Sequence, residues 1–118
     1  MQTIWKGKYK DLEKTGIYGI YRNNTLVYIG KTSTSFARRK QEHSENITKE
    51  DQSLYLYRYI NKFQKSVIDM RPLLIREYIR SSRKITDQDL YLIELACISL
   101  FRPKCNIAGV SKDFILPK

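Results

Sequence analysis

The chemistry of this chain is first suggested by a single carboxylate in an apolar segment. Glu94 is the only acidic residue between Leu90 and Phe101. If that segment is helical, the residues that share its face are all apolar: Leu90, Cys97, Ile98 and Phe101. A carboxylate in such surroundings costs several kcal/mol unless a cation or hydrogen bonds compensate its charge. Glu94 is therefore either the buried partner of an arginine such as Arg39, or a ligand for a hard divalent cation, Mg²⁺ or Mn²⁺.

A guanidinium and an imidazole lie on an earlier predicted helix. The polar segment Ser33–Ser35 supplies an N-cap for a helix from about Phe36 to Asn46. Residues spaced i, i+3, i+7 and i+11 along it share one face: Phe36, Arg39, His43 and Ile47. The two basic side chains are therefore predicted on the same side as the packing residues.

Two tyrosine-bearing segments near the N-terminus are predicted to form a hairpin that positions these groups. Strand-forming residues run from Gly16-Ile17-Tyr18 to Tyr28-Ile29-Gly30 around the polar turn Arg22–Thr25, and asparagines in that turn can adopt positive φ. Glycine at each outer end permits another group to approach the backbone closely. Taken alone, the pattern fits an ordinary tyrosine-rich hairpin over a core as well as a functional one.

A second helix is predicted over Leu54–Lys65. Apolar residues at helical spacing form a stripe that would face the core: Leu56, Ile60, Phe63 and Val67. Arg58, Lys62 and Lys65 lie off this stripe and form a basic outer face. That face is either simply solvated or in contact with phosphate groups.

The remaining segments predict one strand and one more helix. Leu73–Ile79, after Pro72, has strand composition. A helix starts at Thr86 or Asp87 and runs to about Phe101. Two segments have no predicted helix or strand: a basic, aromatic lead-in over residues 1–15 and a turn back toward the core over Cys105–Gly109.

Composition limits the domain count and the partners. The 118 residues suit one domain, 1–118, whose core needs no metal or disulfide. The formal net charge is +10, from 22 Lys and Arg against 12 Asp and Glu, so we expect a polyanionic partner, and nucleic acid fits best. Two cysteines and one histidine are too few for a zinc site at familiar spacings. No segment has the pattern of a signal peptide or a membrane span, so we expect no membrane partner and a cytoplasmic location.

Taken together, these residues resemble the GIY-YIG nuclease superfamily. The resemblance covers about residues 16–108. The matching positions follow the family's order: Gly16-Ile17-Tyr18, Tyr28-Ile29-Gly30, Arg39 with His43 one turn later, Glu94, and Asn106 in the turn Pro103–Asn106. Two triplets at about the right separation, followed by Arg, Glu and Asn in order, are much more specific than either triplet alone.

The resemblance implies an α/β (α+β) fold, with a small three-stranded antiparallel sheet flanked by helices. It also implies hydrolysis of DNA phosphodiester bonds with one divalent metal ion, Mg²⁺ or Mn²⁺. By analogy, Glu94 binds the metal and Arg39 stabilises the charge that builds on the scissile phosphate. One or both tyrosines either activate or only orient the attacking water, and Asn106 braces the site. The implied catalytic residues are Tyr18, Tyr28, Arg39, His43, Glu94 and Asn106.

Two local duplications leave a choice of residue. Gly19-Ile20-Tyr21 repeats the first triplet, and its separation from Tyr28 favours the first copy. Arg38 precedes Arg39: counting from Gly30 favours Arg38, whereas the helical stripe favours Arg39. We choose Arg39 because it faces the packing side.

The hairpin register gives an independent test of the tyrosine pair. A two-residue turn at Asn23-Asn24 would place Tyr18 and Tyr28 on opposite faces of the hairpin. A three-residue turn, Asn23–Thr25, would place both on one face with Ile20. We therefore predict an odd-numbered turn or a bulge.

These observations predict a metal-dependent DNA endonuclease of phage or mobile-element type. The expected DNA contacts are Lys31, Arg38, Arg58 and Lys62. Relatives often carry a further DNA-binding domain, so target choice here would come from the basic surface, from a homodimer or from a partner protein. The alternatives are a branched-DNA repair or recombination nuclease and a catalytically idle nucleic-acid-binding module on the same fold. A structural basic adaptor would leave Glu94 unexplained.

Overall fold

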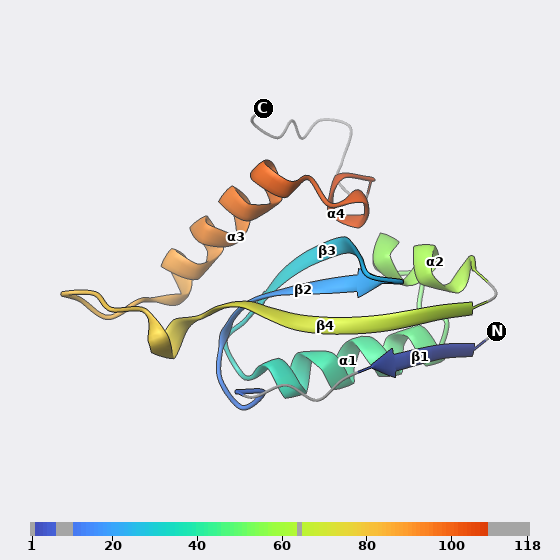
Figure 1. The fold of residues 1–118 in the computed structure, drawn as a ribbon, viewed down its shortest axis with the longest axis horizontal. Helices are drawn as coiled ribbons and strands as arrows, with labels where there is room; N and C mark the ends of the chain where they lie inside the picture. Colours follow the sequence, from blue (N-terminus) through green and yellow to red (C-terminus); the bar gives the residue numbers. More distant parts are fainter. Residues whose placement is uncertain (1, 7–10, 64, 109–118) are drawn as a thin grey trace.

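The computed structural model describes residues 2–6, 11–63 and 65–108. These residues form a four-stranded sheet, in the order β1-β4-β2-β3, with helices on both of its faces (Figure 1). β2 (Gly16–Arg22) pairs antiparallel with β3 (Thr25–Thr32) and with β4 (Lys65–Ile75), and β1 (Gln2–Lys6) pairs parallel with β4. The predicted three-stranded antiparallel sheet flanked by helices is confirmed, and β1 extends it at one edge.

Strand β1 corrects the prediction for the N-terminus, where the sequence indicates only a basic lead-in over residues 1–15. Gln2 lies opposite Lys65 and Lys6 lies opposite Asp69, so β1 covers the outer edge of β4. Covering an edge satisfies backbone groups that would otherwise be free to pair with another chain. Residues 7–10 lie outside the described part of the chain.

The β2–β3 hairpin turns on two asparagines, both with positive φ as predicted: 49° at Asn23 and 67° at Asn24. A two-residue turn of this kind matches the twist of the flanking strands. By itself it would separate the two tyrosines onto opposite faces of the sheet.

A bulge restores the tyrosines to one face. Ile20 pairs with Tyr28, but Tyr21 pairs with Leu26, so Val27 is an extra residue in β3. The extra residue shifts the alternation of side chains by one position. Tyr28 therefore shares a face with Ile20 and Tyr18, and the prediction of an odd-numbered turn or a bulge is confirmed by the bulge.

The predicted strand over Leu73–Ile79 is wrong in position. β4 spans Lys65–Ile75, and Arg76–Tyr78 form a short 3₁₀ helix, η1. Pro72 lies inside the strand instead of before it, opposite Tyr18, where the β2–β4 register shifts. A bulge tolerates proline because no ladder hydrogen bond is required of its nitrogen.

The predicted helix over Leu54–Lys65 is too long, because the chain from Lys65 onward belongs to strand β4. α2 spans only Tyr55–Asn61, and Val67 lies on β4 with 39% of its surface exposed, outside the core stripe. β4 hydrogen-bonds to β1 and β2 along its length. For the residues from Lys65 onward, this strand pairing outweighs the helical spacing of the apolar residues.

The other two long helices begin where the capping residues predict. α1 (Phe36–Thr48) is capped by Ser35, whose hydroxyl accepts a hydrogen bond from the Arg38 N–H at 3.0 Å. α3 (Asp87–Phe101) begins with a reciprocal capping box between Thr86 and Asp89. The predicted C-terminal turn is instead a short helix, α4 (Lys104–Ala108), and Gly109 lies outside the described residues.

The sheet separates two apolar cores. α1 and α2 cover the face that carries Tyr18 and Ile20, whereas α3 covers the face that carries Ile17 and Ile29 (Figure 1). Leu90 and Ile98 bury the inner side of α3 as predicted, but Phe101 is 56% exposed. Within the described residues, no helix is both long enough and apolar enough to span a membrane.

Candidate active site

Tyr18 lies in the middle of the α1/α2-side core and hydrogen-bonds to the predicted histidine. Its side chain is fully buried, and its hydroxyl is 2.7 Å from Nε2 of His43. A Cβ on Gly30 would overlap the Tyr18 hydroxyl, so the glycine of the second triplet makes room for the phenol of the first. Burial raises the pKa of Tyr18, and the charge of Tyr28 raises it further.

His43 is held between two hydroxyl groups. Nδ1 lies 2.8 Å from the hydroxyl of Tyr57 on α2, and the Asn46 side-chain amide donates to the same hydroxyl at 3.1 Å. Burial, followed by the charge of Arg39, lowers the pKa of His43 to about 3, so the ring is neutral at pH 7. The sequence analysis did not identify Tyr57 or Asn46. Asn46 follows His43 by one turn on α1, a spacing that could have indicated it.

Arg39 approaches the same phenol from α1. Its guanidinium lowers the pKa of Tyr18 by charge and by hydrogen bonding, and it pairs with Glu42 at 3.3 Å. The Arg38 side chain is 71% exposed and lies 4.0 Å from Glu42. The geometry therefore brings Arg39, the residue chosen from the helical stripe, to the tyrosines.

Glu94 reaches the same region from α3, on the other side of β3. Burial raises the pKa of its carboxyl group, while Lys31 and Arg39 act in the opposite direction. Burial followed by the Glu94 charge raises the pKa of Tyr28 to about 12. Among the described residues, no hydrogen bond or ion pair joins the Glu94 carboxylate to a cation, and Lys31 and Arg39 act on it only at longer range.

Tyr28 lies between these two groups. Its ring centroid is 6.5 Å from that of Tyr18 and 5.9 Å from that of His43. Tyr28 is only partly buried, in contrast to Tyr18. Of the two phenols, Tyr28 is therefore the one that a water or a substrate can reach.

Asn106 on α4 clamps the strand that carries Tyr28. Its Oδ1 accepts from the Ile29 N–H at 2.7 Å, and its Nδ2 donates to the Ile29 carbonyl at 2.9 Å. β3 is the outer strand at this edge of the sheet, so no other strand among the described residues pairs with these backbone groups. Asn106 thus fixes the backbone beside Tyr28 without contacting the phenol.

The four residues predicted to contact DNA come from three elements: Lys31 from β3, Arg38 from α1, and Arg58 and Lys62 from α2 and its C-cap. Lys31 lies near Glu94, as its effect on the pKa of that carboxyl group indicates. Arg58 packs over the Tyr55 ring at 5.5 Å and Lys62 is exposed at the end of α2. Within the described part of the chain, no hydrogen bond, ion pair or ring contact joins Arg58 or Lys62 to Tyr18, Tyr28, His43 or Glu94.

The donor set fits a divalent cation held by a single protein carboxylate. No group of three His, Cys, Asp or Glu side chains that could hold a metal occurs among the described residues. The Glu94 carboxylate is half-buried and makes no hydrogen bond or ion pair with the described residues. Mg²⁺ commonly binds proteins through one or two carboxylates while keeping several waters. Glu94 would hold such an ion, and no second protein ligand is assigned.

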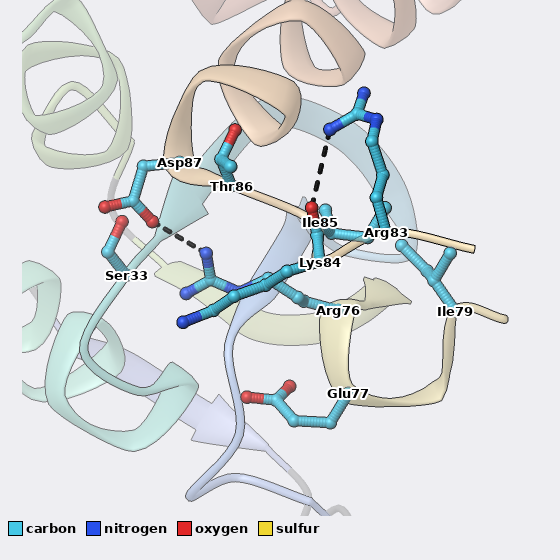
Figure 2. Close-up of a pocket in the computed structure, with 9 residues that line it drawn as sticks. All are labelled: Ser33, Arg76, Glu77, Ile79, Arg83, Lys84, Ile85, Thr86 and Asp87. Carbon is cyan, nitrogen blue, oxygen red and sulfur yellow. Dashed lines mark hydrogen bonds and ion pairs between the residues drawn. The ribbon is translucent and has the colours of Figure 1, made fainter. Parts of the chain in front are cut away.

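A cavity of about 670 Å³ lies elsewhere, between the segment after β4 and the start of α3 (Figure 2). Across it, Arg76 Nη1 pairs with Asp87 Oδ1 at 2.7 Å. Glu77, also in its lining, is bonded to the Thr15 hydroxyl at 2.8 Å. None of the predicted catalytic residues lines this cavity, and several of its charged groups already have partners.

Comparisons with protein-family models, with curated proteins and with solved structures found no match for this chain. Function is therefore inferred from the side chains that the fold assembles around β3. They are two phenols, a guanidinium, a neutral imidazole and a carboxylate, contributed by β2, β3, α1 and α3.

Proposed function

We propose that this protein is a metal-dependent endonuclease of the GIY-YIG type that hydrolyses phosphodiester bonds in DNA. The observation that carries the proposal is the Glu94 carboxylate, which is half-buried, has no hydrogen bond or ion pair among the described residues, and lies within electrostatic range of Tyr28 and Arg39. Uncompensated carboxylates are costly to keep in apolar surroundings, so a bound cation accounts for Glu94 better than packing does.

Each of the chain's own groups has a role that its position supports. Arg39 places a positive charge beside the phenols, where a phosphate could be bound and where negative charge builds in the transition state. Lys31 adds a second cation near the carboxylate. When bound at Glu94, Mg²⁺ would act as a Lewis acid toward the phosphate and lower the pKa of a bound water.

Tyr28 is the phenol that we assign to the attacking water. With a pKa of about 12 it is a neutral hydroxyl at pH 7, which orients a water by hydrogen bonding. Neutralising the Glu94 carboxylate would lower the pKa of Tyr28, because the Glu94 charge is the largest cause of the raised pKa after burial. Tyr18 is buried and bonded to His43, so we assign it to holding the site in place.

DNA is the substrate that the charge of the chain supports. The formal net charge is +10, and exposed basic residues on α1 and α2, such as Arg38, Arg58 and Lys62, could follow the phosphate backbone outside the site. Substituting Arg58 or Lys62 by alanine should leave cleavage chemistry intact and reduce the salt dependence of DNA binding by about one unit of slope each. Titration of binding at several salt concentrations measures this slope.

Cleavage assays with matched variants test the proposal. Supercoiled plasmid and a four-way DNA junction would each be incubated with Mg²⁺ or Mn²⁺ and the parent protein, Glu94→Gln, Arg39→Ala or Arg38→Ala. We expect the parent and Arg38→Ala to cleave, Arg39→Ala to lose about 10²–10³-fold in rate, and Glu94→Gln to be inactive. DNA binding in the absence of metal should be similar in the parent and in Glu94→Gln, and modestly weaker in Arg39→Ala and Arg38→Ala, each of which loses one cation.

The outcomes separate the competing functions. Binding without cleavage by the parent, in both metals and on both substrates, would refute the nuclease and favour the idle nucleic-acid-binding module. Preference for the junction would assign the branched-DNA repair or recombination class over the phage or mobile-element class. Equal cleavage by the parent and Glu94→Gln would remove the metal assignment.

A further inference from the structure

The cavity in Figure 2 lies along α3 from Glu94. Its lining includes Asp87, the first residue of α3, and Ser33, which follows the end of β3. Asp87 precedes Glu94 by about two helical turns, so both carboxylates are on the same face of α3. At a rise of about 1.5 Å per residue, the two positions are about 10 Å apart along the helix axis. The cavity is therefore a near neighbour of the candidate active site.

Lys31 connects the two places electrostatically. It is the penultimate residue of β3, two positions before Ser33. Its ammonium charge acts both on the Glu94 carboxyl group and on that of Asp87, so Lys31 is within electrostatic range of both. A strand of negative charges that passed Glu94 would therefore meet Lys31 and then the cavity.

Among the described residues, the charged side chains that line the cavity leave Lys84 without an ion pair. Arg76 pairs with Asp87 at 2.7 Å, and Arg83 pairs with Asp89 at 2.8 Å, so each acidic charge is offset by an arginine. Lys84 is exposed, and within the described part of the chain its ammonium group has no hydrogen bond. An exposed lysine is often only solvated, so the neighbouring donors decide whether it can hold a ligand.

Three donors gather on one side of the cavity. In Figure 2 the Lys84 and Arg76 side chains extend toward the side on which Ser33 lies. Arg76 uses Nε for Thr15 and Nη1 for its ion pair, so among the described residues Nη2 is left to donate. Glu77, also in the lining, accepts from the Thr15 N–H at 3.1 Å and from the Thr15 hydroxyl at 2.8 Å. An ammonium group, a guanidinium edge and a hydroxyl are donors that bind phosphate oxygens.

We propose that Lys84, Arg76 and Ser33 bind a backbone phosphate of the DNA strand whose scissile phosphate lies at Glu94. One strand of DNA carries a phosphate every 3.4 Å or so, and the separation of about 10 Å along α3 therefore corresponds to about three nucleotides. A backbone contact of this kind fixes the position of the strand and carries no sequence information. The cleavage role of the neighbouring site rests on the proposed function, whereas the phosphate contact requires only that the protein binds DNA.

The salt dependence of DNA binding tests the contact without requiring cleavage. Lys84→Gln should lower the magnitude of the slope of log affinity against log salt by about one unit, and Lys84→Arg should keep the slope of the parent. Lys49→Gln is the matched control, because Lys49 is an exposed lysine at the end of α1, on the opposite face of the sheet (Figure 1). A slope in Lys84→Gln equal to that of the parent, or an equal fall in Lys49→Gln, would overturn the proposal.

Neutral linkages then locate the bound phosphate. On an oligonucleotide that contains a mapped cleavage position, one phosphate at a time is replaced by a methylphosphonate, which carries no charge. We expect one replacement, about three nucleotides from the cleaved bond, to raise the KM of the parent about fivefold with little change in kcat, and to have no effect on Lys84→Gln. If every replacement affected the parent and Lys84→Gln equally, the position assigned to the phosphate would be refuted. If the parent cleaved no DNA, the proposed function would fail, and the salt dependence alone would decide the phosphate contact.

Discussion

The two sides of the candidate site differ in how completely their polar groups are hydrogen-bonded. On the α1/α2 side, His43 is fully buried and both ring nitrogens have partners. On the α3 side, Glu94 is only partly buried, and the described residues offer its carboxylate no compensating bond. The first side is a complete polar network that specifies a single arrangement. The second is a half-buried charge that Lys31 and Arg39 favour only at longer range, without a hydrogen bond or ion pair among the described residues.

The sharpest test of this contrast is the response of the α1/α2 side to acid. His43 has a pKa of about 3 in the folded protein, against 6.5 when unfolded. The unfolded chain therefore binds a proton first, and stability is full above pH 6.5 and falls as the pH drops toward 3. At about 1.4 kcal/mol per pH unit, the loss reaches roughly 3 kcal/mol at pH 4.5 and roughly 5 kcal/mol near pH 3.

Chemical denaturation at pH values between 7.5 and 4.5 measures this slope. His43→Gln should have a lower free energy of unfolding at pH 7.5 but a shallower decline with acid, because the proton-binding group is gone. Parallel declines in the parent and in His43→Gln would mean that the buried imidazole is not the group that responds.

The next effect comes from the close approach of Gly30 to Tyr18. A methyl group at Gly30 would overlap the phenol oxygen, so Gly30→Ala must displace Tyr18 from His43. We expect a loss of about 1–3 kcal/mol in the free energy of unfolding, together with loss of cleavage. Gly19→Ala is the matched control, because its nearest contact, at 2.8 Å, is the end of the Leu26 side chain, which can move. Equal effects of the two substitutions would show that the Gly30–Tyr18 contact is not specific.

The smallest change in stability is expected on the α3 side. Glu94→Gln keeps the shape and removes a half-buried charge, so the free energy of unfolding should stay the same or rise by less than about 1 kcal/mol. Mg²⁺ at ten times its Kd should stabilise the parent by about 1.4 kcal/mol and leave the variant unaffected. Thermal unfolding with and without Mg²⁺ checks both points. A clear destabilisation by Glu94→Gln would make Glu94 a structural residue and remove the contrast.

Local chemistry was enough to predict the parts of the fold that position the site. Ser35 and the Thr86–Asp89 box mark the starts of α1 and α3 because capping depends on residues a few positions apart. The asparagines indicated the position of the turn because they can adopt positive φ. The strict alternation of side chains along a strand then required an odd-numbered turn or a bulge. The helical stripe likewise placed Arg39, instead of Arg38, beside the tyrosines.

Non-local pairing accounts for most of what the sequence did not reveal. Val67 continues the helical spacing of α2, yet it belongs to β4, because partners far away in the chain, on β1 and β2, hold that segment extended. No local pattern of residues 2–6 indicates that they pair with β4. Tyr57 meets His43 only because α2 packs against α1, so its role is visible from the contact at Nδ1 and not from its position in the chain.

The extra residue in β3 has a consequence for how this chain tolerates length variation. Removing Val27 alone would leave Leu26 opposite Tyr21 and Tyr28 opposite Ile20, so the ladder would close regularly and both phenols would stay on one face. Removing Leu26 together with Val27 would place Tyr28 opposite Tyr21, which turns the second phenol toward the opposite apolar layer and away from the guanidinium. The hairpin should therefore tolerate loss of the one extra residue better than loss of a pair, although the pair includes that residue.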